Sequence, residues 1–387
     1  MKTKIIILIF LSLSVKSIAQ ISVLLNIPGR LQWDNANGYC GETSIQMSAL
    51  YYGNYICEDV CRTVAGGELL VAGNDVTALN AFSFTYEEWD YNQATPQYQN
   101  YLVWTKQHLN NRHPVIITVF VLGMSDPDYD HIIPAIGFNA TNVNTFNGAD
   151  ELMFNDCYDS IYYTRTFASV WDTRSMSGNG ATNEYCIPKN VDYGIAVTGI
   201  KDVQHVTKPV HLSIDSWDEP NISLGENPKV LHATITADSL TAGQKYALLR
   251  YNNYLNVPSS NFNPLTADSA IYFTASSATE SFTNSFMSNT AVFYRCIPYN
   301  YNDILEIKTN KDLIIYPSPA INQIVIENTD FSIGDIIGIY DVQGKLLMQN
   351  NLLQTKTNIN ISSLSKGVYV VKLSNNRYSL VKRFLKK

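Results

Sequence analysis

The alternation of apolar and polar positions along the chain separates four blocks. The first is a short apolar run, Ile5–Val15, which follows two lysines and precedes Ser17-Ile18-Ala19. It is too short to span a bilayer, whose hydrocarbon core of about 30 Å takes roughly 20 apolar residues as a helix. Small residues after such a run are typical of a signal-peptidase site. Residues 1–19 are therefore predicted to be a cleaved signal peptide, and no transmembrane anchor is expected.

Residues 20–203 mix helical and strand periods. Apolar residues at helical spacing predict a helix over Cys40–Tyr52, which stops at Gly53, and a second helix after Pro96. Three later apolar runs are predicted to be strands: Val115–Leu122, His131–Phe138 and Glu151–Phe154. Helices followed by a sheet indicate an α+β domain.

Residues 204–307 change to short β-type runs separated by Ser, Asn, Asp, Pro and Gly. Strands are predicted at Val210–Ile214, Val230–Thr236, Gln244–Tyr251, Ala270–Thr274 and Ala291–Cys296. Short strands at this spacing are typical of an all-β sandwich. No catalytic constellation is evident in this block.

Residues 308–387 form a fourth block of β-type runs with an ordered set of motifs. These are Tyr316-Pro317-Ser318-Pro319-Ala320, a hairpin turn at Asp341–Gly344, a strand from Gly367 to Leu373, and the basic tail Lys382–Lys387. This order resembles the C-terminal sorting domain of cargo for the Bacteroidetes type IX secretion system. The resemblance implies contact with the secretion machinery, passage across the outer membrane, and a secreted or cell-surface location.

Charge and cysteine content narrow the function classes. The formal net charge is -7, and only the tail is locally basic, so nucleic acid is not an expected partner. An even count of six cysteines in an exported protein favours disulfides. If Cys40 is instead a reactive thiol, five cysteines are left and at least one more cannot pair.

Cys40 stands where a nucleophile would be activated. It follows a Gly-containing turn and opens a predicted helix. Backbone N–H groups and the helix dipole stabilise a thiolate there, against an ordinary thiol pKa of about 8.5. The alternative, that Cys40 is half of a disulfide, stays open at this point.

A thiolate that transfers acyl groups needs an imidazole that accepts and returns a proton. Of six histidines, His131 is best placed, at the head of a strand, although it could also be a structural histidine. The next strand ends in Asn155-Asp156, which offers an amide or a carboxylate to orient the imidazole. Asp156 is the preferred orienting residue and Asn155 the alternative.

The order of a cysteine helix, a histidine strand and an Asp or Asn strand resembles the papain-like fold, in the branch of the double-glycine leader peptidases. The resemblance covers about Gln32 to Trp171. It implies a thiolate at Cys40, general acid–base work by His131 and orientation by Asp156. The family's glutamine six residues before the cysteine is Asp34 here, so Gln32 is the oxyanion candidate, with Asn37 behind it.

No cofactor or metal is expected. The run Asp126–Asp130 begins like a calcium loop, but His131 stands where the sharp-turn Gly belongs and Gly137 where the bidentate Glu belongs. The sequence thus predicts a papain-like α+β domain, an all-β sandwich and a small all-β sorting domain. The predicted activity is that of a secreted cysteine hydrolase, a peptidase acting on a peptide or protein substrate. The alternatives are a catalytically inactive papain-like surface or binding protein, and an amide hydrolase with a non-peptide substrate.

Overall fold

The computed structural model describes ten stretches of the chain: residues 20–33, 38–69, 73–120, 131–170, 185–216, 228–299, 313–327, 336–351, 354–374 and 379–387. The predicted signal peptide, Asp34, Asn37, the Asp126–Asp130 run and Trp171 lie outside the described residues. Contacts divide the chain into two units. One comprises Met1–Ile200, Ser213–Ala233 and Ser285–Asn289, and the other Lys201–Leu212, Thr234–Asn284 and Thr290–Lys387.

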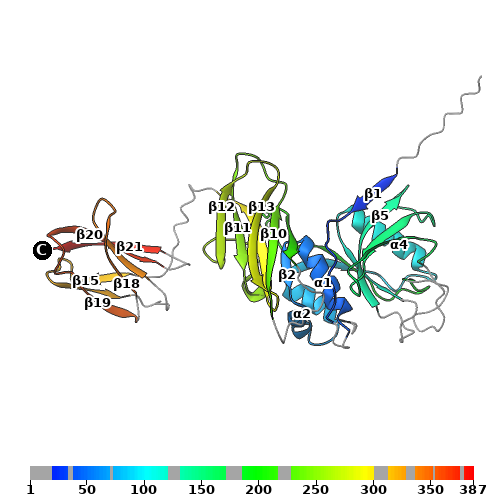
Figure 1. The fold of residues 1–387 in the computed structure, drawn as a ribbon, viewed down its shortest axis with the longest axis horizontal. Coiled ribbons are helices and arrows are strands. Elements are labelled where there is room, and N and C mark those ends of the chain that lie inside the picture. Colours follow the sequence, from blue (N-terminus) through cyan, green and yellow to red (C-terminus); the bar gives the residue numbers. More distant parts are fainter. Residues whose placement is uncertain are drawn as a thin grey trace, which may run out of the picture. The chain divides into compact units, whose positions relative to one another are not determined.

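Strands from residues 21–200 of the first unit join one antiparallel sheet (Figure 1). The strands are β1 (Ile21–Leu24), β3 (Phe84–Glu88), β4 (Val115–Val119), β5 (His131–Ala140), β6 (Glu151–Asn155), β7 (Tyr162–Thr166) and β8 (Ile195–Ile200). Their order is β3-β8-β4-β5-β6-β7, and β1 pairs with β5. The predicted strands are present in β4, β5 and β6. The prediction that the sheet follows the helices was wrong, because β1 precedes the first helix and β3 lies between two later helices. Strands of four or five residues are too short to show their period reliably.

Four helices are interleaved with these strands in the described residues: α1 (Cys40–Tyr51), α2 (Glu58–Ala65), α3 (Asn74–Ala81) and α4 (Tyr98–Asn110), with the short strand β2 (Asn54–Ile56) after α1. The structure confirms the predicted helices at α1 and α4. Residues 40–50 of α1 are all buried, so this helix lies within the interior of the unit and lacks an exposed polar stripe. The sequence did not predict α2 and α3, which have eight residues each.

In its described residues the middle block contains six strands and the short 3-10 helix η1 (Tyr254–Asn256). The strands are β9 (Val210–Ser216), β10 (Val230–Ala237), β11 (Lys245–Tyr251), β12 (Ser269–Thr274), β13 (Glu280–Met287) and β14 (Ala291–Pro298). One sheet has the order β13-β10-β9, and in another β11 lies between β12 and β14. All five predicted strands are present. The sequence missed β13, because polar residues fill most of its length. The domain boundaries after residues 203 and 307 stay predictions.

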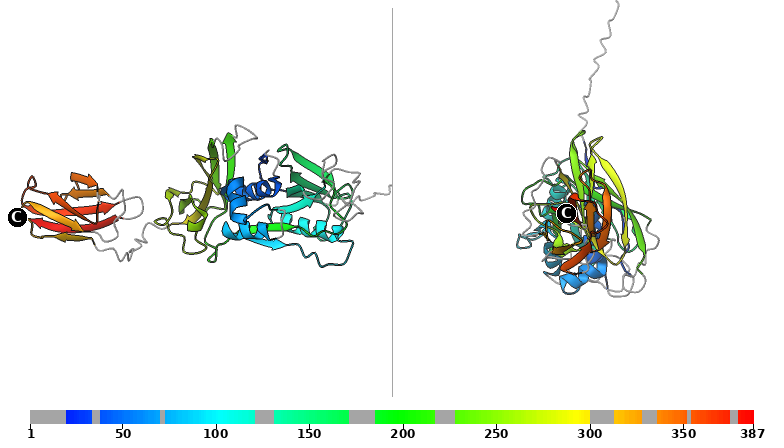
Figure 2. Two further views of the ribbon diagram at one scale, coloured as in Figure 1. Left: turned by 90° about the horizontal axis from the view of Figure 1, so that it is seen from below. Right: turned by 90° about the vertical axis from the view of Figure 1, so that its left-hand side faces the viewer.

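The described residues of the C-terminal block form two sheets (Figure 2). Buried apolar side chains from both sheets make up one core. The strands are β15 (Ile314–Tyr316), β16 (Gln323–Glu327), β17 (Ile336–Tyr340), β18 (Leu346–Asn351), β19 (Lys356–Asn360), β20 (Gly367–Ser374) and β21 (Ser379–Lys386). The predicted hairpin turn is confirmed: Gly344 N–H donates to the Asp341 carbonyl at 3.1 Å, and Gly344 has a φ of 85°. The described chain as a whole is mostly β-sheet with few helices.

Candidate active site

Cys40 is the first residue of α1, and the start of this helix lies against the beginning of β5. The Ser44 hydroxyl oxygen lies 2.8 Å from the Cys40 carbonyl oxygen and 3.0 Å from that of Ile132. Gly41 allows this approach, since a Cβ there would lie 3.3 Å from the Ile132 side chain and 2.7 Å from that of Leu69. The first N–H groups of a helix have no intrahelical acceptor. Cys40 therefore combines a helix N-terminus with a position next to the strand that carries His131.

Residues of α2 hold the turn before Cys40. The Arg62 guanidinium donates to Glu42 Oε1 at 2.6 Å, donates to the Gly38 carbonyl, and lies 3.6 Å from the centre of the Tyr39 ring. The Tyr39 hydroxyl donates to Asp59 at 2.8 Å. Burial raises the pKa of Glu42, although the hydrogen bond from Arg62 opposes this shift. These contacts fix the backbone on both sides of Cys40.

His131 and Asp156 are brought together at the edge between β5 and the end of β6. His131 Nε2 lies 2.8 Å from Asp156 Oδ1, and both side chains are buried. The Tyr185 hydroxyl donates to Oδ2 at 2.5 Å and the Tyr158 N–H donates to Oδ1 at 2.9 Å. Burial alone would raise the pKa of Asp156, but the bond to His131 and these two donors outweigh it and lower the pKa. Asp156 is thus a carboxylate, which assigns the proton of His131 to Nε2.

The other ring nitrogen of His131, Nδ1, differs from Nε2 in its surroundings. Nδ1 is buried and has no hydrogen-bond partner among the described residues. With the proton on Nε2, the Nδ1 lone pair is available. The Tyr158 ring stacks on the imidazole at 4.2 Å with an interplanar angle of 16°. Asp156 and Tyr158 therefore fix both the tautomer and the plane of the ring.

Gln32 and Asn155 have different surroundings. Gln32 N–H donates to the Cys157 carbonyl at 2.8 Å, and Cys157 Sγ lies 3.3 Å from Gln32 Oε1. Asn155 Nδ2 donates to the Ile27 carbonyl at 2.9 Å, so its amide holds the segment after β1 and Asp156 contacts His131. Gln32 therefore lies next to the Asp156-Cys157 pair, whereas the Asn155 amide is engaged elsewhere.

None of the six cysteines, all of which are described, is in a disulfide. Burial raises the pKa of the Cys157 thiol well above its ordinary value, and the charges of Cys40 and Asp156 raise it further. Cys40 and Asp156 are therefore both close enough to Cys157 to raise the pKa of its thiol.

Three side chains could offer ligands to a metal. Ligand atoms of His131, Asp156 and Cys157 lie within 4.8 Å of one another. A metal needs a thiolate, whereas burial favours the protonated thiol of Cys157. Both Asp156 oxygens already accept hydrogen bonds. The contacts therefore fit a hydrogen-bonded network better than a metal centre.

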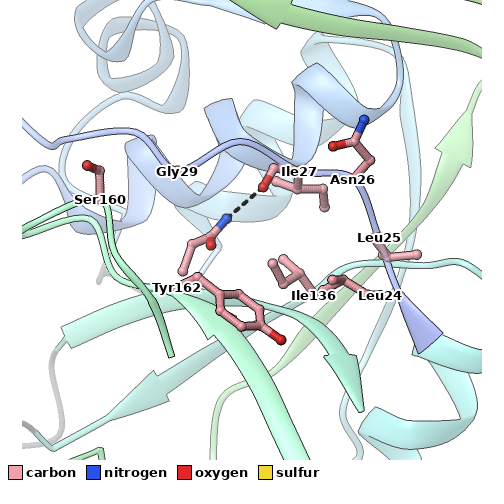
Figure 3. Close-up of a pocket in the computed structure, with 9 residues that line it drawn as sticks. Leu24, Leu25, Asn26, Ile27, Gly29, Ile136, Ser160 and Tyr162 are labelled. Atoms are coloured by element: carbon pink, nitrogen blue, oxygen red, sulfur yellow. Dashed lines mark hydrogen bonds between the residues drawn. The ribbon is translucent and has the colours of Figure 1, made fainter. Parts of the chain in front are cut away.

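A pocket of about 330 Å³ is lined by the end of β1 and the segment after it, by β5, and by residues from the end of β6 to β7 (Figure 3). Its lining includes Leu24, Leu25, Ile27, Ile136, Ser160 and Tyr162, with the Asn155 amide as a polar group. Gly29 closes one side, since a Cβ there would lie 2.4 Å from the Ser160 carbonyl oxygen. The pocket thus shares the 155–160 segment with the candidate site.

The sequence did not predict several residues of the site. Arg62 lies on an unpredicted helix, and Tyr185 comes 29 residues after Asp156 with a left-handed φ of 59°. Nothing in the sequence connects either residue to Cys40 or His131. Tyr158 is different, because it lies two residues after Asp156 and its N–H folds back onto that carboxylate as in an Asx turn.

Comparison with known proteins bears on the end of the chain. Residues 314–387 match the family of secretion system C-terminal sorting domains. The chain ends in a sorting domain. The protein is therefore a cargo or component of the type IX route that is secreted across the outer membrane to the cell surface, and the sorting domain implies an interaction with the secretion machinery. The family match does not extend to the residues around Cys40, His131 and Asp156.

One similar solved structure is PorZ, described as an essential bacterial surface component of the type-IX secretion system of Porphyromonas gingivalis. The identity is 9% over 70% of this chain and 51% of that chain, with a TM-score of 0.18. The chain thus spans about half the length of PorZ. No curated protein matches the chain. In the described residues, no helix combines the length and apolar character needed to cross a membrane.

Proposed function

We propose that the protein is a secreted cysteine hydrolase, a peptidase that cleaves a peptide or protein substrate. The observation that carries the proposal is the buried His131 ring, with Nε2 held 2.8 Å from Asp156 and Nδ1 unpartnered among the described residues. Cys40 at the helix start beside β5 supplies the nucleophile. The resemblance of the Cys, His and Asp order to papain-like peptidases supports the same assignment.

Nδ1 has no hydrogen-bond partner among the described residues, so the Cys40 thiol must first approach it. The proposed reaction then begins with transfer of the Cys40 thiol proton to His131 Nδ1. The ionised Asp156 stabilises the imidazolium that forms. The thiolate attacks the substrate carbonyl carbon, and the carbonyl oxygen becomes an oxyanion. N–H groups at the start of α1 and the Gln32 carboxamide are the donors for this oxyanion, an effect usually worth about 3 kcal/mol per donor.

The tetrahedral intermediate then collapses. The bond to the leaving nitrogen breaks as His131 returns its proton to that nitrogen, and an acyl-Cys40 thioester remains. A water molecule, deprotonated by His131, attacks the thioester carbonyl. The C–S bond breaks, Cys40 recovers its proton, and the product leaves as a carboxylic acid. The His131 imidazole therefore serves as base and as acid both in the formation and in the hydrolysis of the thioester.

One observation favours the alternative of a catalytically inactive surface or binding protein. Cys40 is only 6% exposed and His131 only 1% exposed. A substrate carbonyl must reach Cys40 for the proposed reaction to occur, so some of the covering groups must move. Labelling of Cys40 by a small alkylating probe in the folded protein measures this access directly.

The deciding experiment is Cys40→Ala in the secreted protein, assayed on quenched fluorescent casein and a mixed peptide library. Turnover should disappear, while Cys296→Ala, which removes a buried thiol from β14, should keep it. Rapid alkylation of Cys40 that slows in His131→Ala would support the dyad. Unchanged hydrolysis by Cys40→Ala would overturn the proposal.

A further inference from the structure

We propose that Cys157 is a positioning residue whose thiol orients the Gln32 carboxamide toward the oxyanion. This inference rests on the proposed hydrolase function. The evidence is the pair of contacts between the two residues: Gln32 N–H to the Cys157 carbonyl at 2.8 Å, and Cys157 Sγ to Gln32 Oε1 at 3.3 Å. Backbone and side chain are therefore both held by Cys157.

The direction of the hydrogen bond between Cys157 Sγ and Gln32 Oε1 determines where the Gln32 amide nitrogen points. A thiol has one hydrogen, and Cys157 Sγ has two oxygen neighbours, Gln32 Oε1 at 3.3 Å and the Ile132 carbonyl at 3.8 Å. Sulfur is a weak acceptor, so the S–H donates to the nearer oxygen. With Oε1 held by the thiol, the carboxamide NH₂ is turned away from Cys157, and the proposal assigns this NH₂ to the substrate oxygen.

Burial suits Cys157 to this role. Its side chain is inaccessible to solvent, and burial together with the charges of Cys40 and Asp156 raises its pKa well above the ordinary value. The thiol therefore keeps its proton while Cys40 loses one. A thiolate at Cys157 would have no hydrogen to donate and would repel Gln32 Oε1.

In this proposal, two adjacent residues hold two different groups of the site. Asp156 holds the base, His131, at 2.8 Å, and the next residue holds the oxyanion donor, Gln32. Both groups are set by the backbone at the end of β6. The distance between base and oxyanion donor is thus fixed by two adjacent residues.

The test compares Cys157→Ala and Cys157→Ser in the secreted full chain. Loss of a single oxyanion donor lowers kcat by about 10²- to 10³-fold, so Cys157→Ala should lower kcat by up to about 10²-fold with little change in KM. Cys157→Ser keeps a hydroxyl donor and should recover much of the loss. In a cycle with Gln32→Ala, the double variant should be no slower than Gln32→Ala alone.

A second measurement distinguishes loss of Gln32 orientation from a wider disturbance of the site. Alkylation of Cys40 by iodoacetamide forms no oxyanion, so its rate should be unchanged in Cys157→Ala, whereas a disturbed Asp156–His131 pair would slow it. Fully additive losses in the cycle, or a Cys157→Ser variant as slow as Cys157→Ala, would overturn the inference. Those results leave the hydrolase proposal intact as long as Cys40→Ala abolishes turnover.

Discussion

The C-terminal block and the first unit differ in the kinds of side chain that they bury. In the C-terminal block, strands alternate buried and exposed positions; β16, for example, buries Ile324 and Ile326. Lys386 is the one polar or charged side chain buried in the described part of that block. In the first unit, α1 is buried on every side, and the interior contains carboxyl groups, thiols and an imidazole.

This difference separates a core of apolar side chains from a core that also contains ionisable groups. Apolar burial in alternating strands stabilises the sorting block through area removed from water, which is largely insensitive to pH. Buried ionisable groups cost free energy unless they are hydrogen-bonded, so their retention in the first unit indicates a role besides stability. Substitutions in the two regions should therefore have different consequences.

The largest expected effect separates export from chemistry. Removal of residues 314–387 should leave the protein inside the outer membrane, because this segment is the sorting domain. Immunoblots of cell-surface and periplasmic fractions measure the distribution. Val342→Ser, at an exposed position of the hairpin turn, is the matched control and should be exported normally. Truncated protein at the cell surface would contradict the prediction.

The second effect concerns chemistry alone. His131→Ala should lower turnover by about 10³-fold, since general acid–base catalysis contributes about 10²- to 10⁴-fold. Export should be unchanged, because the sorting block is intact. His232→Ala, which removes an exposed imidazole from β10, is the control for histidine loss. Activity within twofold of the natural protein in His131→Ala would remove His131 from the mechanism.

The same contrast explains how much the sequence could predict. In the C-terminal block, turn chemistry and alternation are local, so the Asp341–Gly344 hairpin and β20 appeared at their predicted places. The helix start at Cys40 was also predicted, because a glycine-containing turn precedes an apolar helical pattern. In each case the signal lies within a few residues of the element.

The contacts that complete the candidate site are not local. Tyr185 reaches Asp156 and Arg62 reaches Glu42 across 29 and 20 residues. Cys157 contacts Gln32 across 125 residues. Such pairs depend on how β6, α2 and the segment after β1 pack together, and neither propensity nor periodicity contains that information. Cys40, His131 and Asp156 could be named because each stands at an element's end.

A smaller effect should appear in the pH dependence of stability. Burial raises the pKa of Glu58 to about 7, although hydrogen bonds from Trp33 and Thr43 favour its charged form. A carboxyl with a raised folded pKa contributes stability that is present below its unfolded pKa, about 4.3, and is lost as pH rises through about 7. Between pH 5 and 8 the natural protein should lose on the order of 2 kcal/mol that Glu58→Gln keeps.

Thermal or urea unfolding at several pH values tests this difference. Glu327→Gln, in the sorting block, is the control: hydrogen bonds from Tyr316 and Lys356 lower the pKa of Glu327, so its carboxyl stays ionised over this range. Its pH slope should match that of the natural protein. An unchanged slope in Glu58→Gln would show that Glu58 does not titrate on folding.

The smallest expected effect is a difference in unfolding free energy between alanine substitutions at two glycines. At Gly29 an added Cβ would lie 2.4 Å from the Ser160 carbonyl oxygen, whereas at Gly367 the nearest atom would be 3.9 Å away. Gly29→Ala should cost about 1–3 kcal/mol of unfolding free energy, because a backbone segment must move. That segment follows Asp156-Cys157, so kcat should also fall. Gly367→Ala should change stability by less than about 0.5 kcal/mol. If the two variants lose equal unfolding free energy in urea, the segment after β6 moves easily to accept the added Cβ. That segment could then not fix the positions of His131 and Gln32 tightly.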